Sequence, residues 1–99
     1  MSDLGVLNGP ASAPAAVSVG TSPVELKAGA SRYGERRVVT FQPTDGDIYF
    51  AYSDDGVGLT TSTGLLIRKG QLVSLEASDQ IGVWAVAAAT TDVRVQEVS

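Results

Sequence analysis

Two acidic turns are the first places in the sequence where side chains able to do chemistry gather. Asp45 and Asp47 lie in "TDGD", and Asp54 and Asp55 lie in "SDDG". A calcium loop needs regularly spaced oxygen ligands that end in a Glu, and neither turn has them. An extended strand between the turns would hold Asp47 and Asp54 about 20 Å apart. We therefore expect ordinary turn chemistry here, for which Asp and Gly are the usual residues, and no metal site.

Nucleophilic catalysis needs a general base beside a hydroxyl or thiol, and the sequence supplies few candidates. It has no His and no Cys, and its only lysines are Lys27 and Lys69. The stretch "GLTTSTG" offers hydroxyls without a base, and short strands leave little room for two carboxylates facing each other across a sugar-binding cleft. We expect no catalytic residue and no cofactor, and therefore a protein that is not an enzyme. The same composition excludes a disulfide and a zinc site of the usual His and Cys ligands.

Four aromatic side chains leave a binding function open. Tyr33, Tyr49, Tyr52 and Trp84 could form a platform for sugar rings if they shared one exposed sheet face. Aromatic residues more often fill a core or an interface, which is the interpretation favoured here.

The charge balance argues against nucleic acid and membrane partners. The net charge is -4, from 7 basic and 11 acidic residues, and the one basic cluster, "SRYGERR", is interrupted by Glu35. A nucleic-acid binder normally presents a basic patch that neutralises phosphates. No apolar run approaches the roughly 20 residues that a membrane-spanning helix needs.

Short stretches of alternating apolar and polar residues, separated by turn residues, predict an all-β protein. No window shows a convincing helical period. We expect a small antiparallel β-sandwich, jelly-roll-like, with an extended N-terminal arm, and a small barrel remains an alternative. Reversals at "PTDGD" and "TTD" predict β-hairpins over 36–52 and 81–98. Strands are expected within 16–20, 22–29, 36–42, 48–52, 65–77 (two short strands), 81–88 and 93–98.

The first sixteen residues differ in composition from the rest. They are rich in Gly, Ala, Ser and Pro, and such a segment buries too little apolar surface to fold alone. We divide the chain into a flexible or extended arm, 1–16, and a sandwich domain, 17–99. Leu4, Val6 and Leu7 would anchor the arm if it lies on a neighbouring molecule; the alternative is a disordered tail.

The stretch "IGVWAVAAA" is apolar on both faces of the strand that it predicts, and "IYFAY" shares this property. A strand that is apolar on both faces is normally covered on both. Because 99 residues offer a small core, we expect another subunit to supply the second cover. Tyr49, Trp84 and Val86 are the expected interface residues, and a closed barrel with small outward residues is the alternative.

From about Val17 to Val98 the chain resembles small accessory proteins of tailed-phage particles. The features that carry the resemblance are a "V-x-V-G" opening, the strand "RRVVTFQ", "DIYFAY" followed by a "TTSTG" loop, a "KG" turn before "QLVSLEA", and "IGVWAVAAATTDVRVQE". The proteins in question are head decoration or cement proteins and the base domains of head or neck fibres. The resemblance implies a β-sandwich, often trimeric, whose N-terminal arm docks on major capsid or neck proteins.

The expected function is therefore that of a non-enzymatic virion structural protein. It would assemble in the host cytoplasm, associate with itself as a homo-oligomer, with a trimer favoured, and bind the capsid or neck surface. A head–tail joining or tail component and a carbohydrate-binding β-sandwich module are the alternatives.

Overall fold

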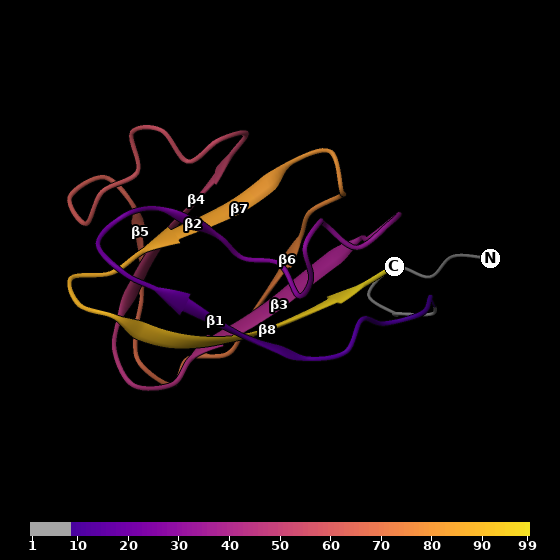
Figure 1. Cartoon of the computed structure of the whole chain (residues 1–99), viewed down its shortest axis with the longest axis horizontal. Coiled ribbons are helices and arrows are strands. Elements are labelled where there is room, and N and C mark those ends of the chain that lie inside the picture. Colours follow the sequence, from indigo (N-terminus) through magenta and orange to yellow (C-terminus); the bar gives the residue numbers. More distant parts are fainter. Residues whose placement is uncertain (1–8) are drawn as a thin grey trace.

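Two four-stranded antiparallel sheets packed face to face make up the fold (Figure 1), and the computed structural model describes it for residues 9–99. The first sheet contains, in spatial order, β1 (Ala15–Val19), β8 (Thr91–Val98), β3 (Val38–Pro43) and β6 (Val73–Glu76). The second contains β2 (Val24–Glu25), β7 (Gly82–Val86), β4 (Ile48–Ser53) and β5 (Leu65–Ile67). The prediction of an all-β, antiparallel sandwich is confirmed.

The strand order follows one simple rule. β1 pairs with β8, β2 with β7, β3 with β6, and β4 with β5, so the first half of the chain folds back along the second half like one long hairpin. This long hairpin is folded over on itself. As a result, β3 also pairs with β8 and β4 with β7, and these two pairs form the centres of the two sheets. An eight-stranded double sheet of this kind is a jelly roll.

Both predicted hairpins, 36–52 and 81–98, are wrong. β3 and β4 lie in different sheets, as do β7 and β8, and among the described strands only β4 and β5 are consecutive partners. The turn residues do reverse the chain, but they carry it across the sandwich to the other sheet. The strands then take long-range partners, with Phe41 opposite Val95 and Phe50 opposite Ala85.

The core lies between the sheets and follows the period of two. In β3, Val39 and Phe41 are buried, and in β8 Val93 and Val95 meet them from the same sheet. The ring of Phe41 packs edge-on against Phe50 of the opposite sheet, with 5.8 Å between their centroids. Each such side chain contributes about 1.5–3 kcal/mol relative to an exposed position.

Residues 9–16 of the predicted arm lie extended along the end of β8. The Ser12 N–H donates to the Glu97 carbonyl at 2.8 Å, the Ser99 N–H donates to Pro10 at 3.0 Å, and Ala11 forms a bridge with Val98. β1 begins at Ala15, inside the predicted arm. The boundary at 16/17 concerns independent folding and stays a prediction. Residues 9–99 contain no helix with the length and apolarity to cross a bilayer.

Candidate functional site

Trp84, a predicted interface residue, lies beneath the connection between β4 and β5. Gly56 of this connection has φ of 77°, and a Cβ there would come within 2.6 Å of Trp84 Cε3 and 3.1 Å of Pro23 Cβ. Only glycine combines that backbone conformation with so close an approach. The protein's own chain therefore covers the indole ring from outside.

The same connection covers two further predicted interface residues. A Cβ at Gly64 would lie 2.7 Å from Tyr49 Cβ and 2.8 Å from Leu59 Cδ1. Leu59 is itself buried, and it lines one hollow together with Val86, which is 2% exposed. The second apolar face of β4 and β7 is thus packed beneath residues 54–64 of the same molecule.

The interface roles of Tyr49, Trp84 and Val86 stay predictions. Residues 54–64 of the same molecule lie over or beside each of these side chains. The other three predicted interface residues, Leu4, Val6 and Leu7, lie outside the described residues.

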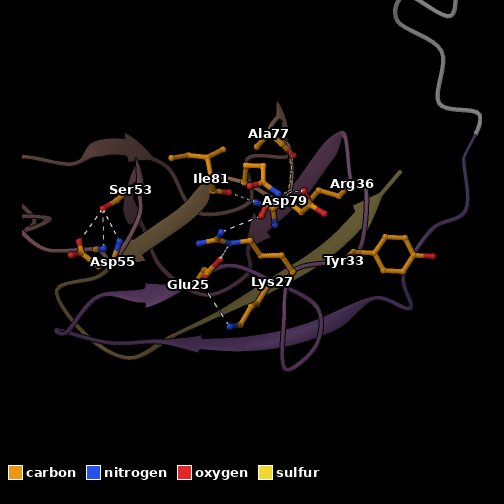
Figure 2. Close-up of polar contacts among 12 residues, drawn as sticks. Glu25, Lys27, Tyr33, Arg36, Ser53, Asp55, Ala77, Asp79 and Ile81 are labelled. Atoms are coloured by element: carbon orange, nitrogen blue, oxygen red, sulfur yellow. Dashed lines mark hydrogen bonds and ion pairs between the residues drawn. The ribbon is translucent and has the colours of Figure 1, made fainter.

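The most extensively bonded side chains form a buried ion pair that the sequence did not single out. Arg36 and Glu97 are each 1% exposed, and Arg36 Nη1 donates to Glu97 Oε1 at 2.6 Å. The guanidinium also donates from Nε to the Ala77 carbonyl at 3.1 Å and from Nη2 to the Ile81 carbonyl at 2.7 Å. Figure 2 shows Arg36 reaching the connection between β6 and β7. The Arg36 side chain therefore links the β2–β3 connection, in which it lies, to the β6–β7 connection and to β8.

Glu97 holds the long connection between β2 and β3. Its carboxylate accepts from the backbone N–H of Ala28 at 2.9 Å and of Tyr33 at 3.1 Å, besides Arg36. A buried charge is tolerated when such partners replace water. The arrangement is structural, because its polar groups are used up within the protein.

A hollow of about 380 Å³ next to this network is lined by charged residues, among them Glu25, Lys27, Arg32 and Asp79. Arg32 donates to Glu25 through Nε and to the Asp79 carbonyl through Nη1. Lys27 Nζ lies 3.7 Å from the Glu25 carboxylate (Figure 2). Two cations thus face two anions, so the hollow has no surplus charge with which to attract an ionic ligand.

The Asp79 carboxylate also holds a neighbouring loop. It accepts from the Glu35 N–H at 2.8 Å, and this bond, with a second from the Gln80 side chain, holds the pKa of Asp79 below its ordinary value. Glu35 has φ of 57°, a conformation that is uncommon outside glycine. The bond therefore stabilises the turn that leads into Arg36.

The carboxylates of the acidic turns face backbone N–H groups. Asp45 accepts from the Asp92 N–H at 2.9 Å, Asp47 from the Lys69 N–H at 2.7 Å, and Asp55 from the Val57 N–H at 3.0 Å. The Asp55 bond is the local turn chemistry that the sequence predicts, whereas Asp45 and Asp47 each bond to a loop far away in the sequence. Residues 9–99 contain no group of three or more Asp or Glu placed to hold a metal ion.

The four aromatic residues do not share one platform. Tyr52, 48% exposed, stands against Phe50 on the core-facing side of β4, with 6.0 Å between ring centroids. Tyr49 and Trp84 lie on the opposite side of that sheet, under the β4–β5 connection. A flat sugar-stacking surface built from all four is therefore absent from the described part of the chain.

Exposed apolar side chains concentrate near β5, an edge strand of the second sheet. Leu65 and Leu66 are 60% and 43% exposed. Beside the start of β5, Tyr52 and Val57 line a further hollow of about 190 Å³. Of the five large hydrophobic residues that are exposed among residues 9–99, four lie in or near this part of the second sheet.

Sequence signals existed for some of these features. Glu97 has the same period-2 phase as the buried Val93 and Val95, so the alternation in β8 already indicated an inward carboxylate. Arg36 precedes its strand, and no pattern marks it as buried. The exposure of Leu65 and Leu66 depends on β5 being an edge strand, which local sequence does not specify.

No protein-family model matches this chain, and neither a curated protein nor a solved structure does.

Proposed function

We propose that this chain is a non-enzymatic structural protein of a tailed-phage particle. It associates with itself and binds the capsid or neck surface, as a decoration or cement protein or as the base of a fibre. Its place is the virion, which assembles in the host cytoplasm.

The observation that carries the proposal is the strand order β1-β8-β3-β6 over β2-β7-β4-β5. Jelly rolls of this kind serve as viral capsid proteins and as lectin domains. The fold alone does not define a function, so this support is an analogy. It agrees with the resemblance that the strands and turns from Val17 to Val98 bear to virion accessory proteins.

The use of polar groups also fits a structural role. Arg36, Glu97 and Asp79 bond to loops, and the carboxylates of the turns bond to backbone N–H groups. Such bonds fix loop conformations, which a particle component needs more than a reactive surface.

In the proposed assembly, arm residues 1–16 contact major capsid or neck proteins, with Leu4, Val6 and Leu7 as anchors. The resemblance implies three copies around one axis. A head–tail joining or tail component would have the same fold, and its position on the particle distinguishes it.

Quantitative mass spectrometry of purified particles from the virus whose genome encodes this chain tests the proposal. We expect the chain at a fixed copy number relative to the major capsid protein, retained after a high-salt wash. Immunogold labelling then locates it on the head, neck or tail. Its absence from washed particles would refute the proposal.

A carbohydrate-binding module is the second candidate, because the fold also occurs in lectins. Of the four aromatic residues, only Tyr52 is strongly exposed. Glycan-array binding by the isolated chain that is lost in Tyr52→Ala would favour this candidate over the virion role.

A further inference from the structure

We propose that the edge of β5 is a self-association surface, on which β5 of a second copy pairs antiparallel about a two-fold axis near Leu66. The second sheet would continue from one molecule into the other as eight strands. The proposed function includes self-association, for which the resemblance implies three copies; this inference instead gives a two-fold contact, and it does not depend on a virion location.

Edge strands present unpaired backbone N–H and C=O groups, and proteins usually protect them. Three of the four edges here carry such protection. β2 has two residues and follows Pro23, β1 follows Pro14 and directs Ser18 outward, and β6 exposes Ser74 and Glu76. A proline at the strand start and outward polar residues discourage pairing with another chain. β5 is also short, with three residues, and differs from the other edges in exposing leucines.

β5 lacks polar protection. Its sequence is Leu-Leu-Ile, with Leu65 and Leu66 exposed on opposite faces of the strand. Leu66 pairs with Tyr49 and Leu65 with Phe50, so both faces of this edge present leucine to solvent. Such an edge fits a partner strand that is also apolar on both faces. β5 of a second copy meets this requirement.

The ladder beyond β5 is also incomplete. β5 covers β4 only from Ile48 to Phe50, so Ala51–Ser53 have no strand on that side within the described residues. The hollow beside them is lined by Tyr52 and Val57, and Val57 is 82% exposed. A strand arriving from a second copy would extend toward this hollow, whose lining also includes Leu59, Ser53 and Thr63.

Charge selects the antiparallel direction. The exposed residues Arg68 and Lys69 follow β5, and the exposed residues Asp54 and Asp55 lie in the turn after β4, toward the other end of the antiparallel β4–β5 pair. The Asp47 carboxylate, which accepts from the Lys69 N–H, offsets part of the charge at the basic end. Antiparallel copies would bring the basic end of each β5 toward the acidic turn of the other, whereas parallel copies would place like charges together. An antiparallel pair of identical strands has two-fold symmetry, so the predicted assembly is a dimer.

Sedimentation equilibrium of the full chain tests this contact, over about 10 µM to 1 mM because a three-residue ladder makes a weak interface. The average mass should rise from 10.2 kDa toward 20.4 kDa, which is twice the chain mass. Leu66→Lys should raise the dissociation constant at least about tenfold, because it places two like charges at the axis and lysine discourages edge pairing.

Leu72→Lys is the matched control. Leu72 is 67% exposed and lies outside β5, so this variant should change the dissociation constant by less than about twofold. Far-ultraviolet circular dichroism checks that both variants fold. If Leu66→Lys does not fold, a charge exchange replaces it: Asp54→Lys with Asp55→Lys should weaken the dimer, and adding Arg68→Asp with Lys69→Asp should restore it.

Four results would overturn the inference: a monomer at every concentration, a trimer, equal effects of the two lysine variants, or a dimer that is lost only when residues 1–8 are removed. A trimer would refute the two-fold β5 contact and leave the proposed function standing. Absence of the chain from particles would refute the proposed function and leave a measured dimer standing.

Discussion

Arg36 and Glu97 are both 1% exposed, on a connection and a strand whose residues lie far apart in the sequence. Removing one partner of a buried ion pair leaves an unpaired buried charge and typically costs about 3–5 kcal/mol. Here each partner also holds backbone groups of a loop, so a loss of the pair would release the β2–β3 connection as well.

Glu97→Gln should therefore lower the free energy of unfolding by about 3 kcal/mol or more, since an amide NH₂ would meet donors from Arg36 or the backbone. Replacing both partners by Met should cost less than the sum of the two single Met replacements, because neither charge is then left alone. Urea denaturation measures all variants. Arg94→Met, which breaks the exposed pair with Asp92, is the control and should cost under about 0.5 kcal/mol. Equal costs for Glu97→Gln and Arg94→Met would contradict the buried-pair account.

Asp79 makes a contribution to the free energy of unfolding that is lost as the pH falls. The Glu35 N–H and then the Gln80 side chain lower the pKa of Asp79 in the folded protein. The stabilisation is therefore fully present above the unfolded-state pKa of about 4 and disappears as the pH falls through the lower folded-state pKa. Asp79→Asn should make the urea midpoint fall less steeply with decreasing pH in the acid range. Identical slopes for the variant and the wild type would show that the bond contributes nothing.

At the scale of elements, the β4–β5 connection covers the outer face of the apolar run 81–89 within the same molecule. Gly56→Ala tests this cover, because its methyl group would meet the Trp84 ring. The control is Gly70→Ala: Gly70 also has positive φ, 83°, but a Cβ there meets nothing within 4 Å. Both variants should lose roughly 1–2 kcal/mol through the backbone, and Gly56→Ala should lose about 1–3 kcal/mol more through overpacking.

Trp84 is the single tryptophan, so its fluorescence reports the cover directly. Gly56→Ala should shift the emission to longer wavelength, and Gly70→Ala should leave it unchanged. Equal destabilisation of the two variants with no shift for Gly56→Ala would show that the connection does not pack on the indole ring.

Residues 9–14 supply a second element-scale test. A chain lacking residues 1–14 should be less stable than one lacking residues 1–8 by roughly 1–2 kcal/mol, because it loses the Ser12 and Pro10 bonds to the end of β8. Thermal unfolding of both chains gives the difference. Equal melting temperatures would mean that this segment contributes no net stability.

Local pattern predicted the strands and the faces of β3 and β8, because a period of two directly reports which side chains are buried. It could not assign strands to sheets, since turn residues at 43–47 specify a reversal and not its destination. The cover of Trp84 was missed for the same reason. The path of residues 54–64 depends on two close approaches, at Gly56 and Gly64, which sequence alone shows only as glycines.

At the scale of the whole molecule, wrapping one long hairpin into two sheets leaves four strand edges. β2 has two residues, β1 exposes Ala16 and Ser18, and β6 exposes Ser74 and Glu76, whereas the three-residue β5 exposes Leu65 and Leu66. Among the described residues 9–99, β5 is the edge strand with exposed leucines, so we expect the proposed association with another copy to use this edge. This links the fold to the structural role proposed for it.

Hydrogen–deuterium exchange of the wild-type chain at low and high concentration tests this central claim most directly. The account predicts that amides within Leu65–Ile67 exchange more slowly at high concentration, while those of β1 and β6 exchange at unchanged rates. Exchange at β5 that is independent of concentration in a chain that does associate, or protection that arises at β1 or β6 instead, would contradict it.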